Sequence, residues 1–200
     1  MNHKLTEIVF ILDRSGSMGG LEADTIGGFN GFVKKQAALG RTLLTTILFD
    51  DHYEILHDQI DARNTVLTKE TYFTRGTTAL LDAIGKTINK IGGRLNKTPE
   101  HERPGKVIFI ITTDGLENAS REFTYTKIKE MINHQTEKYS WEFVFLGANI
   151  DVIEEGDKLG ICSDYTCEYE ATSVGTRKMF YAAENICYGL RKSKYGDLND

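Results

Sequence analysis

The chain has 200 residues, of which 40% are hydrophobic and 26% are charged, and its formal net charge at pH 7 is −5. This composition is typical of a folded globular protein and excludes an intrinsically disordered chain. The acidic balance, without a concentrated basic face, argues against a protein that binds nucleic acid.

The first part of the chain alternates short apolar runs with segments of helical period, which is typical of βαβ units and a mainly parallel sheet. Residues 7–13 predict a strand that is too uniformly apolar to leave one face in water. Residues 18–37 predict a helix. Its apolar stripe contains Ile26, Phe29, Val33 and Ala37. The strand-like runs 42–50 and 53–60 are separated by only Asp51 and His52, so they predict an antiparallel hairpin at one edge of the sheet.

The same alternation continues through the rest of the chain. A helix is expected to end at Gly92-Gly93, and the polar stretch that holds Pro99 and Pro104 is expected to be an exposed loop. The apolar positions of that helix are Leu81, Ile84, Ile88 and Ile91. The elements that follow are a buried strand at 106–114, a helix carrying Tyr125, Ile128, Met131 and Ile132, a strand at 141–147, a helix near 151–159, a short strand near 165–169, and a final helix carrying Met179, Ala183, Ile186 and Leu190.

These elements predict a single α/β domain over residues 1–200, of the doubly wound type, with a mostly parallel sheet, an antiparallel edge strand and helices on both faces. We expect no membrane insertion, because no apolar run approaches about 18 residues. The apolar stretch from Ile8 to Leu12 is too short for the core of a signal peptide, so we expect a cytoplasmic location.

Three cysteines occur, at Cys162, Cys167 and Cys187. An odd number does not indicate a disulfide framework, and their spacing lacks the paired histidines of a zinc site. We therefore expect buried structural thiols.

Polar residues follow two of the most apolar strands at the point where each strand ends. Asp13 closes the first strand and Asp114 closes the strand at 106–114. Ligands of parallel sheets bind outside the carboxyl ends of the strands, so the two carboxylates face one crevice if their strands are neighbours. The segment "TRGTTALLDAI" brings Thr77 and Thr78 to the same edge, at the start of the next helix.

The first of these loops continues with Ser15 and Ser17, so the pooled side chains offer only carboxylate and hydroxyl oxygens. Such hard ligands select Mg²⁺ or Mn²⁺ and disfavour zinc or copper. The N-terminus of the helix that follows Thr78 would disfavour a cation by about 0.3–1 kcal/mol, and the two negative charges of Asp13 and Asp114 must outweigh this effect.

Asp13, Ser15 and Ser17 in "ILDRSGSMGG", followed by Thr78 and then by Asp114 in "IITTDG", resemble the metal-ion-dependent adhesion site (MIDAS) of von Willebrand factor type A (vWA) domains of the stand-alone bacterial type. The resemblance covers roughly residues 5–160, and the strand and helix over 161–192 are expected to pack on that core. It implies a Rossmann-like three-layer sandwich in which these five residues bind Mg²⁺, with Mn²⁺ or Ca²⁺ as alternatives. Thr77 is the alternative to Thr78, one position away.

The resemblance also implies a mechanism. One coordination position accepts an Asp or Glu side chain of a partner protein, and the chain has no catalytic activity of its own. The sequence leaves the partner, the oligomeric state and any switch of affinity open. For the rim of the site, Glu117 and Asn118 are the stronger candidates to contact a partner, while Asn149 and Asp151 are better explained by a helix cap.

Enzymatic alternatives fit the residues less well. A phosphatase that uses Asp13 as a nucleophile needs a second carboxylate two residues later, where Ser15 stands. Ser17 lacks a Gly-x-Ser-x-Gly elbow and a histidine placed at the same edge. Gly85-Lys86-Thr87 resembles the end of a P-loop, but the first glycine of that motif is replaced by Leu80. A metal-dependent phosphohydrolase and a structural module with a stabilising ion are the alternatives to protein binding.

Overall fold

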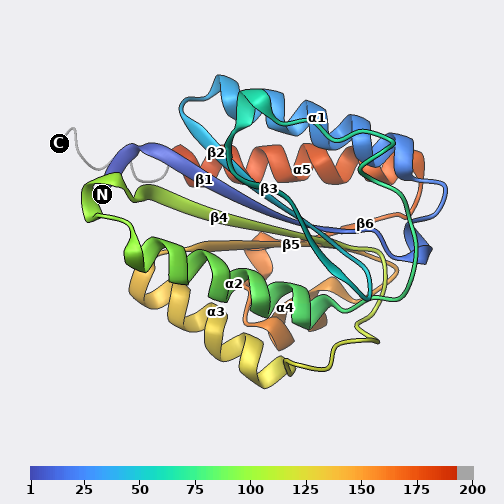
Figure 1. The fold of residues 1–200 in the computed structure, drawn as a ribbon. Helices are drawn as coiled ribbons and strands as arrows, with labels where there is room; N and C mark the ends of the chain where they lie inside the picture. Colours follow the sequence, from blue (N-terminus) through green and yellow to red (C-terminus); the bar gives the residue numbers. More distant parts are fainter. Residues whose placement is uncertain (193–200) are drawn as a thin grey trace.

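The computed structural model describes residues 1–192 and shows a six-stranded sheet with helices on both faces (Figure 1). The strands are β1 (Asn2–Asp13), β2 (Thr42–Phe49), β3 (Tyr53–Asp61), β4 (Pro104–Thr113), β5 (Glu142–Ala148) and β6 (Thr166–Tyr169). The helices are α1 (Glu22–Ala38), α2 (Leu80–Lys97), α3 (Tyr125–Tyr139), α4 (Val152–Leu159) and α5 (Ser173–Lys192). Residues 193–200, which the sequence prediction included in the domain, lie outside the described residues.

The strand order is β3-β2-β1-β4-β5-β6. Every neighbouring pair is parallel except β2 and β3, which form the antiparallel edge hairpin that the sequence predicted. In this doubly wound order the chain reverses its direction of winding between β1 and β4, which places a ligand crevice at the carboxyl ends of these two strands. Their register pairs Leu12 with Thr112, so Asp13 and Asp114 follow neighbouring positions.

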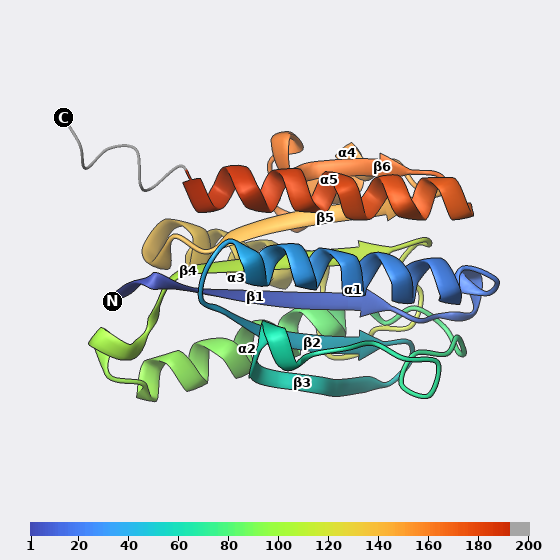
Figure 2. The ribbon, with the colours of Figure 1, turned by 90° about the horizontal axis from the view of Figure 1, so that it is seen from above.

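Two apolar cores lie on the two faces of the sheet. Helices α1 and α5 cover one face, and α2, α3 and α4 cover the other (Figures 1 and 2). Alternate residues of β1 point to opposite faces, so Phe10 and Leu12 enter the α1 and α5 core while Val9 and Ile11 enter the other. All four are fully buried, which confirms that the first strand is covered on both sides.

The approach of α1 to α5 depends on a glycine. A Cβ atom on Gly28 would collide with the ring of the buried Phe180, whereas a Cβ on Gly31 meets nothing within 4 Å. Helix α5 therefore packs closely against α1 because residue 28 has no side chain.

Three sequence predictions were wrong in detail. Helix α2 continues through Gly92-Gly93 to Lys97, because a glycine in a helix costs only about 1 kcal/mol and Leu95 is still buried beyond the pair. The stretch before β4 is exposed at residues 99–102, as predicted, but it forms a short 3-10 turn, and Pro104 already belongs to the strand. Of the three thiols only Cys187 is buried, since Cys162 is exposed and Cys167 is half-buried on the edge strand β6.

Within residues 1–192, none of the helices combines the length and the apolar character needed to cross a lipid bilayer.

Candidate metal centre

The carboxyl edge of the two central strands carries the predicted acidic pair. Asp13 is the last residue of β1, and Asp114 directly follows the end of β4. Their exposed fractions are 0% and 2%, although each belongs to a residue type that usually lies at the surface. Two carboxylates are therefore buried at the ends of neighbouring strands.

Hydrogen bonds join these carboxylates to the serines of the first loop. The Ser15 N–H donates to Asp13 Oδ1 over 2.7 Å, and Ser15 Oγ lies 3.0 Å from Ser17 Oγ. The Ser17 hydroxyl in turn donates to Asp114 Oδ1 over 2.5 Å. Asp13, Ser15, Ser17 and Asp114 thus form one continuous chain of polar contacts.

The segment that contains Thr78 is tied to both of these loops. The Gly16 N–H donates to Gly76 O over 3.1 Å, and the Asn118 N–H donates to Thr78 O over the same distance. Thr78 N–H donates to Asn118 Oδ1 over 2.9 Å. These contacts place Thr78 between the Gly16 loop and the Asn118 loop, although none of them involves its hydroxyl. Thr78 is buried and Thr77 is exposed, which favours the former as the residue of this segment that faces the site.

The protein does not fully compensate the buried carboxylates of Asp13 and Asp114. Burial raises the pKa of Asp13 to about 6, although hydrogen bonds from Thr113 and Ser15 lower it, and burial also raises the pKa of Asp114. Asp114 Oδ2 is buried and has no hydrogen-bond partner within residues 1–192. A buried, unpaired carboxylate oxygen is costly, and a hard cation is the kind of partner that removes the cost. The donor set therefore fits a divalent metal ion.

The basic residue next to Asp13 does not neutralise this charge. The buried guanidinium of Arg14 donates from Nε to Asp50 Oδ2 over 2.9 Å and from Nη1 to Glu54 Oε2 over 2.8 Å. Arg14 therefore ties the first loop to the β2–β3 hairpin and leaves the carboxylate of Asp13 to other partners.

Hydroxyl groups from distant segments hold the ends of the two strands. Thr113 Oγ1 donates to Asp13 Oδ2 over 2.7 Å, and the Tyr72 hydroxyl donates to Asp13 O over 2.7 Å. On the other strand, the Tyr169 hydroxyl of β6 donates to Thr113 O over 3.3 Å. These supports could not be predicted from the sequence, because no spacing rule connects a loop tyrosine or an edge strand to a strand end.

A second group of metal-type ligands lies in the hairpin at Asp50, Asp51 and His52. Both carboxylate oxygens of Asp50 already accept hydrogen bonds, Oδ2 from Arg14 and Arg75 and Oδ1 from the His52 N–H. Burial raises the pKa of Asp50, but these hydrogen bonds hold it below its ordinary value. Asp50 is thus satisfied by the protein, and the group is a weaker candidate than the edge at Asp13 and Asp114.

The loop that follows Asp114 caps helix α2. Glu117 Oε2 accepts a hydrogen bond from the Leu81 N–H over 2.9 Å, and Ser120 Oγ accepts one from the Asp82 N–H over 3.0 Å. The Asp82 carboxylate accepts hydrogen bonds from the N–H groups of residues 121–123. The side chains of Glu117 and Asn118, which the sequence favoured as contacts for a partner, are therefore engaged within the chain.

The helix cap predicted after β5 is confirmed for Asp151 and is wrong for Asn149. Asp151 Oδ1 accepts hydrogen bonds from the Ile153 and Glu154 N–H groups at the start of α4. Asn149 has a left-handed backbone with φ of 57°, and its side-chain amide donates to Asp114 O over 3.3 Å. The loop after β5 therefore supports the backbone of the site.

Comparisons with solved structures identify the fold. No family model and no curated protein matches the chain. The vWF domain of the type V pili tip protein Mfa5 from Porphyromonas gingivalis is similar, with 11% identity and a TM-score of 0.66 over 92% of this chain and 95% of that chain. Manganese-loaded TRAP protein from Plasmodium vivax is also similar, with 17% identity and a TM-score of 0.64 over 90% of this chain and 73% of that chain.

Proximal thread matrix protein 1 from the mussel byssus has 15% identity and a TM-score of 0.62 over 93% of this chain. The chain spans only 46% of the length of that protein. At such identities the likeness shows the fold, and the chain has the von Willebrand factor type A fold that the sequence resemblance implied.

Proposed function

We propose that this chain is a protein-binding module that holds Mg²⁺ and binds an Asp or Glu side chain of a partner protein at the carboxyl edge of β1 and β4. The residues that would hold the ion are Asp13, Ser15, Ser17, Thr78 and Asp114. The observation that carries the proposal is the chain of polar contacts from Asp13 to Asp114, together with the buried Asp114 Oδ2, which has no hydrogen-bond partner among residues 1–192. A bound Mg²⁺ would supply positive charge and, because it prefers six oxygen ligands, would leave one coordination position beside these five residues for an oxygen of the partner.

Each residue has a distinct role in this proposal. Asp13 and Asp114 supply negative charge, and the hydroxyls of Ser15, Ser17 and Thr78 supply neutral oxygen ligands. Thr113 and Tyr72, which bond to the side chain and to the backbone of Asp13, fix the orientation of its carboxylate. Mn²⁺ and Ca²⁺ accept the same kind of ligand, and the manganese-loaded TRAP structure supports a divalent ion on this fold.

Several observations favour binding over catalysis. In the described part of the chain, the groups that hydrogen-bond to Asp13 and Asp114 are hydroxyls and amides, so neither aspartate is paired with a histidine or a second carboxylate that could share a proton transfer. Ser15 occupies the position where a phosphatase of this design needs a second carboxylate. The similar structures include a thread matrix protein and a pili tip protein. We propose that the chain is not an enzyme.

Partner capture from a lysate of the source cells tests the binding proposal. The full chain, immobilised with Mg²⁺ present, should retain a partner that is released by EDTA and is not captured by Asp13→Ala. Asp51→Ala is the matched control, because it removes a carboxylate of the neighbouring hairpin without touching the proposed ligands. Retention of the partner by Asp13→Ala and in EDTA would contradict a metal bridge.

Two further measurements separate the alternatives. Turnover of p-nitrophenyl phosphate with Mg²⁺, lost in Asp13→Ala, would favour the phosphohydrolase. A melting temperature that falls in EDTA, while every captured partner is retained, would favour a structural ion. We expect neither turnover nor metal-independent capture.

A further inference from the structure

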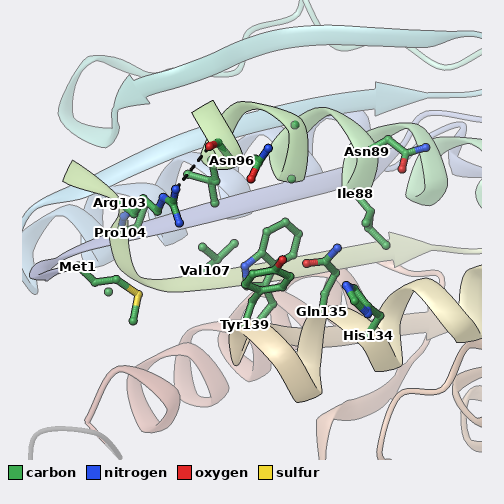
Figure 3. A pocket seen from close by; sticks show the side chains of 15 residues that line it. Met1, Ile88, Asn89, Asn96, Arg103, Pro104, Val107, His134, Gln135 and Tyr139 are labelled. Atoms are coloured by element: carbon green, nitrogen blue, oxygen red, sulfur yellow. Dashed lines mark hydrogen bonds between the residues drawn. The ribbon is translucent and has the colours of Figure 1, made fainter. Parts of the chain in front are cut away.

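A pocket of about 340 Å³ lies between α2 and α3 (Figure 3). It is at the amino end of β4, whereas the proposed metal site is at the carboxyl end of that strand. Pro104 and Val107, at the start of β4, line it, whereas Asp114 follows the end of that strand. At about 3.3 Å per strand residue, the pocket and the proposed metal site are roughly 20 Å apart. The pocket is therefore independent of the metal ligands.

Trp141 forms an apolar surface of the pocket and is the only tryptophan of the chain. Its ring is buried and stacks on Phe109, with the ring centroids 5.3 Å apart and an interplanar angle of 19°. Ser140 has a left-handed backbone with φ of 54°, and the Trp141 N–H donates to Gln135 O over 3.2 Å. This turn ends α3 and brings the tryptophan back against the last turns of the helix.

A glycine of α2 lies against the same residues from the other helix. A Cβ atom on Gly92 would lie 3.9 Å from Gln135 Nε2 and 3.9 Å from Trp141 Cη2. Gly92, Gln135 and Trp141 are therefore close neighbours in the wall of the pocket, and Figure 3 shows the Gln135 amide between the two helices. A longer side chain at Gly92 would occupy this space.

One residue of the pocket wall carries an acceptor that the described part of the protein does not use. Gln135 Oε1 is buried and has no hydrogen-bond partner within residues 1–192. Such an atom carries a desolvation cost that an N–H donor from a ligand would remove. None of the side chains that line the pocket is acidic, and Arg103 is held at its rim by a hydrogen bond from Nε to Thr98 O over 2.8 Å.

We propose that this pocket binds a small, neutral, planar heteroaromatic molecule whose ring packs on Trp141 and whose N–H donates to Gln135 Oε1. The ring would cover the part of the indole that lines the pocket, and aromatic pairs are favourable beyond the area they bury. The volume is at the low end for ligand sites, which fits a molecule of one or two fused rings. This site goes beyond the proposed function and does not depend on it.

A pair of probe molecules tests the assignment. Benzimidazole carries one ring N–H, and 1-methylbenzimidazole is the same ring without that donor. Each is titrated in EDTA into the ¹⁵N-labelled full chain, and the single indole cross-peak of Trp141 reports binding at the pocket. Benzimidazole should shift this peak and bind up to about tenfold more tightly than its methylated form, which is the effect of one hydrogen bond.

Three variants make the test specific. Gln135→Leu should abolish the preference for benzimidazole while both probes still bind, and Gly92→Leu should fill the pocket and abolish binding of both. Gly189→Leu is the matched control, because a Cβ at that position of α5 meets nothing within 4 Å. The proposal is overturned if benzimidazole leaves the Trp141 peak unmoved, if Gln135→Leu keeps the preference, or if Gly92→Leu binds as the natural chain does. Amide spectra of each variant establish that it is folded.

Discussion

Asp82→Asn should destabilise the fold by disconnecting the loop after Asp114 from helix α2. Asp82 is 8% exposed, and its Oδ1 accepts hydrogen bonds from the Glu122 and Phe123 N–H groups, while Oδ2 accepts one from Arg121. Asparagine keeps one acceptor oxygen but presents an NH₂ group to the third N–H. The loss of one hydrogen bond to a charged group, together with a negative charge in the first turn of α2, amounts to about 2–4 kcal/mol.

The pH dependence of this effect has a definite sign. Burial raises the pKa of Asp82, but the backbone hydrogen bonds from residues 121–123 hold it below its ordinary value. Because the folded pKa is depressed, the ionised side chain stabilises the fold above the unfolded pKa of about 3.9, and this stabilisation is lost as pH falls through the folded value. The difference between the natural chain and Asp82→Asn should be constant above about pH 5 and shrink below about pH 4.

Urea denaturation followed by Trp141 fluorescence measures this difference. Asp164→Asn is the control, because Asp164 is exposed and no hydrogen bond to its carboxylate occurs in the described part of the chain. A difference at pH 7 within about 0.5 kcal/mol, the range of an ordinary surface substitution, would refute the reasoning. So would a difference that grows as the solution is acidified.

Three other substitutions test the packing of α1 and the support of the site. Gly28→Ala should lower the free energy of unfolding by about 1–3 kcal/mol, because the new methyl group collides with Phe180, whereas Gly31→Ala should raise it by up to about 1 kcal/mol through helix propensity. Thermal unfolding of the two variants decides this, and a Gly28→Ala chain as stable as Gly31→Ala would be incompatible with the packing described. Tyr72→Phe removes the hydroxyl that bonds to Asp13 O and should cost about 1 kcal/mol of stability while weakening metal binding. Unchanged metal affinity in a destabilised Tyr72→Phe would show that the hydroxyl supports the fold alone.

The sheet and the acidic pair could be predicted because their signals are local. The run from Ile8 to Leu12 is apolar without alternation, which requires burial on both faces, and the structure covers both. Two residues between the runs 42–50 and 53–60 leave room only for a hairpin. Asp13 and Asp114 could be paired because parallel strands end at a common edge.

The features that could not be predicted depend on contacts distant in sequence. Helix α2 passes Gly92-Gly93 because Leu95 is buried in the core beyond the pair, which a local stop signal does not register. The caps that Glu117 and Ser120 provide for α2 come from a loop more than thirty residues later. Tyr72 contacts Asp13 across an even longer separation of 59 residues in the chain. Spacing rules describe one element at a time and carry no information on such pairings.

Titration calorimetry with Mg²⁺ and Mn²⁺ tests the central claim, which is that Asp13 and Asp114 are ligands of a divalent metal ion. The natural chain and Asp51→Asn should bind one ion with equal affinity, and Asp114→Asn should lose at least about tenfold in affinity. The two variants each convert one aspartate into its neutral isostere, on neighbouring loops of the same edge. Equal binding by Asp114→Asn and the natural chain would contradict the account, and a loss confined to Asp51→Asn would place the ion in the hairpin at Asp50, Asp51 and His52.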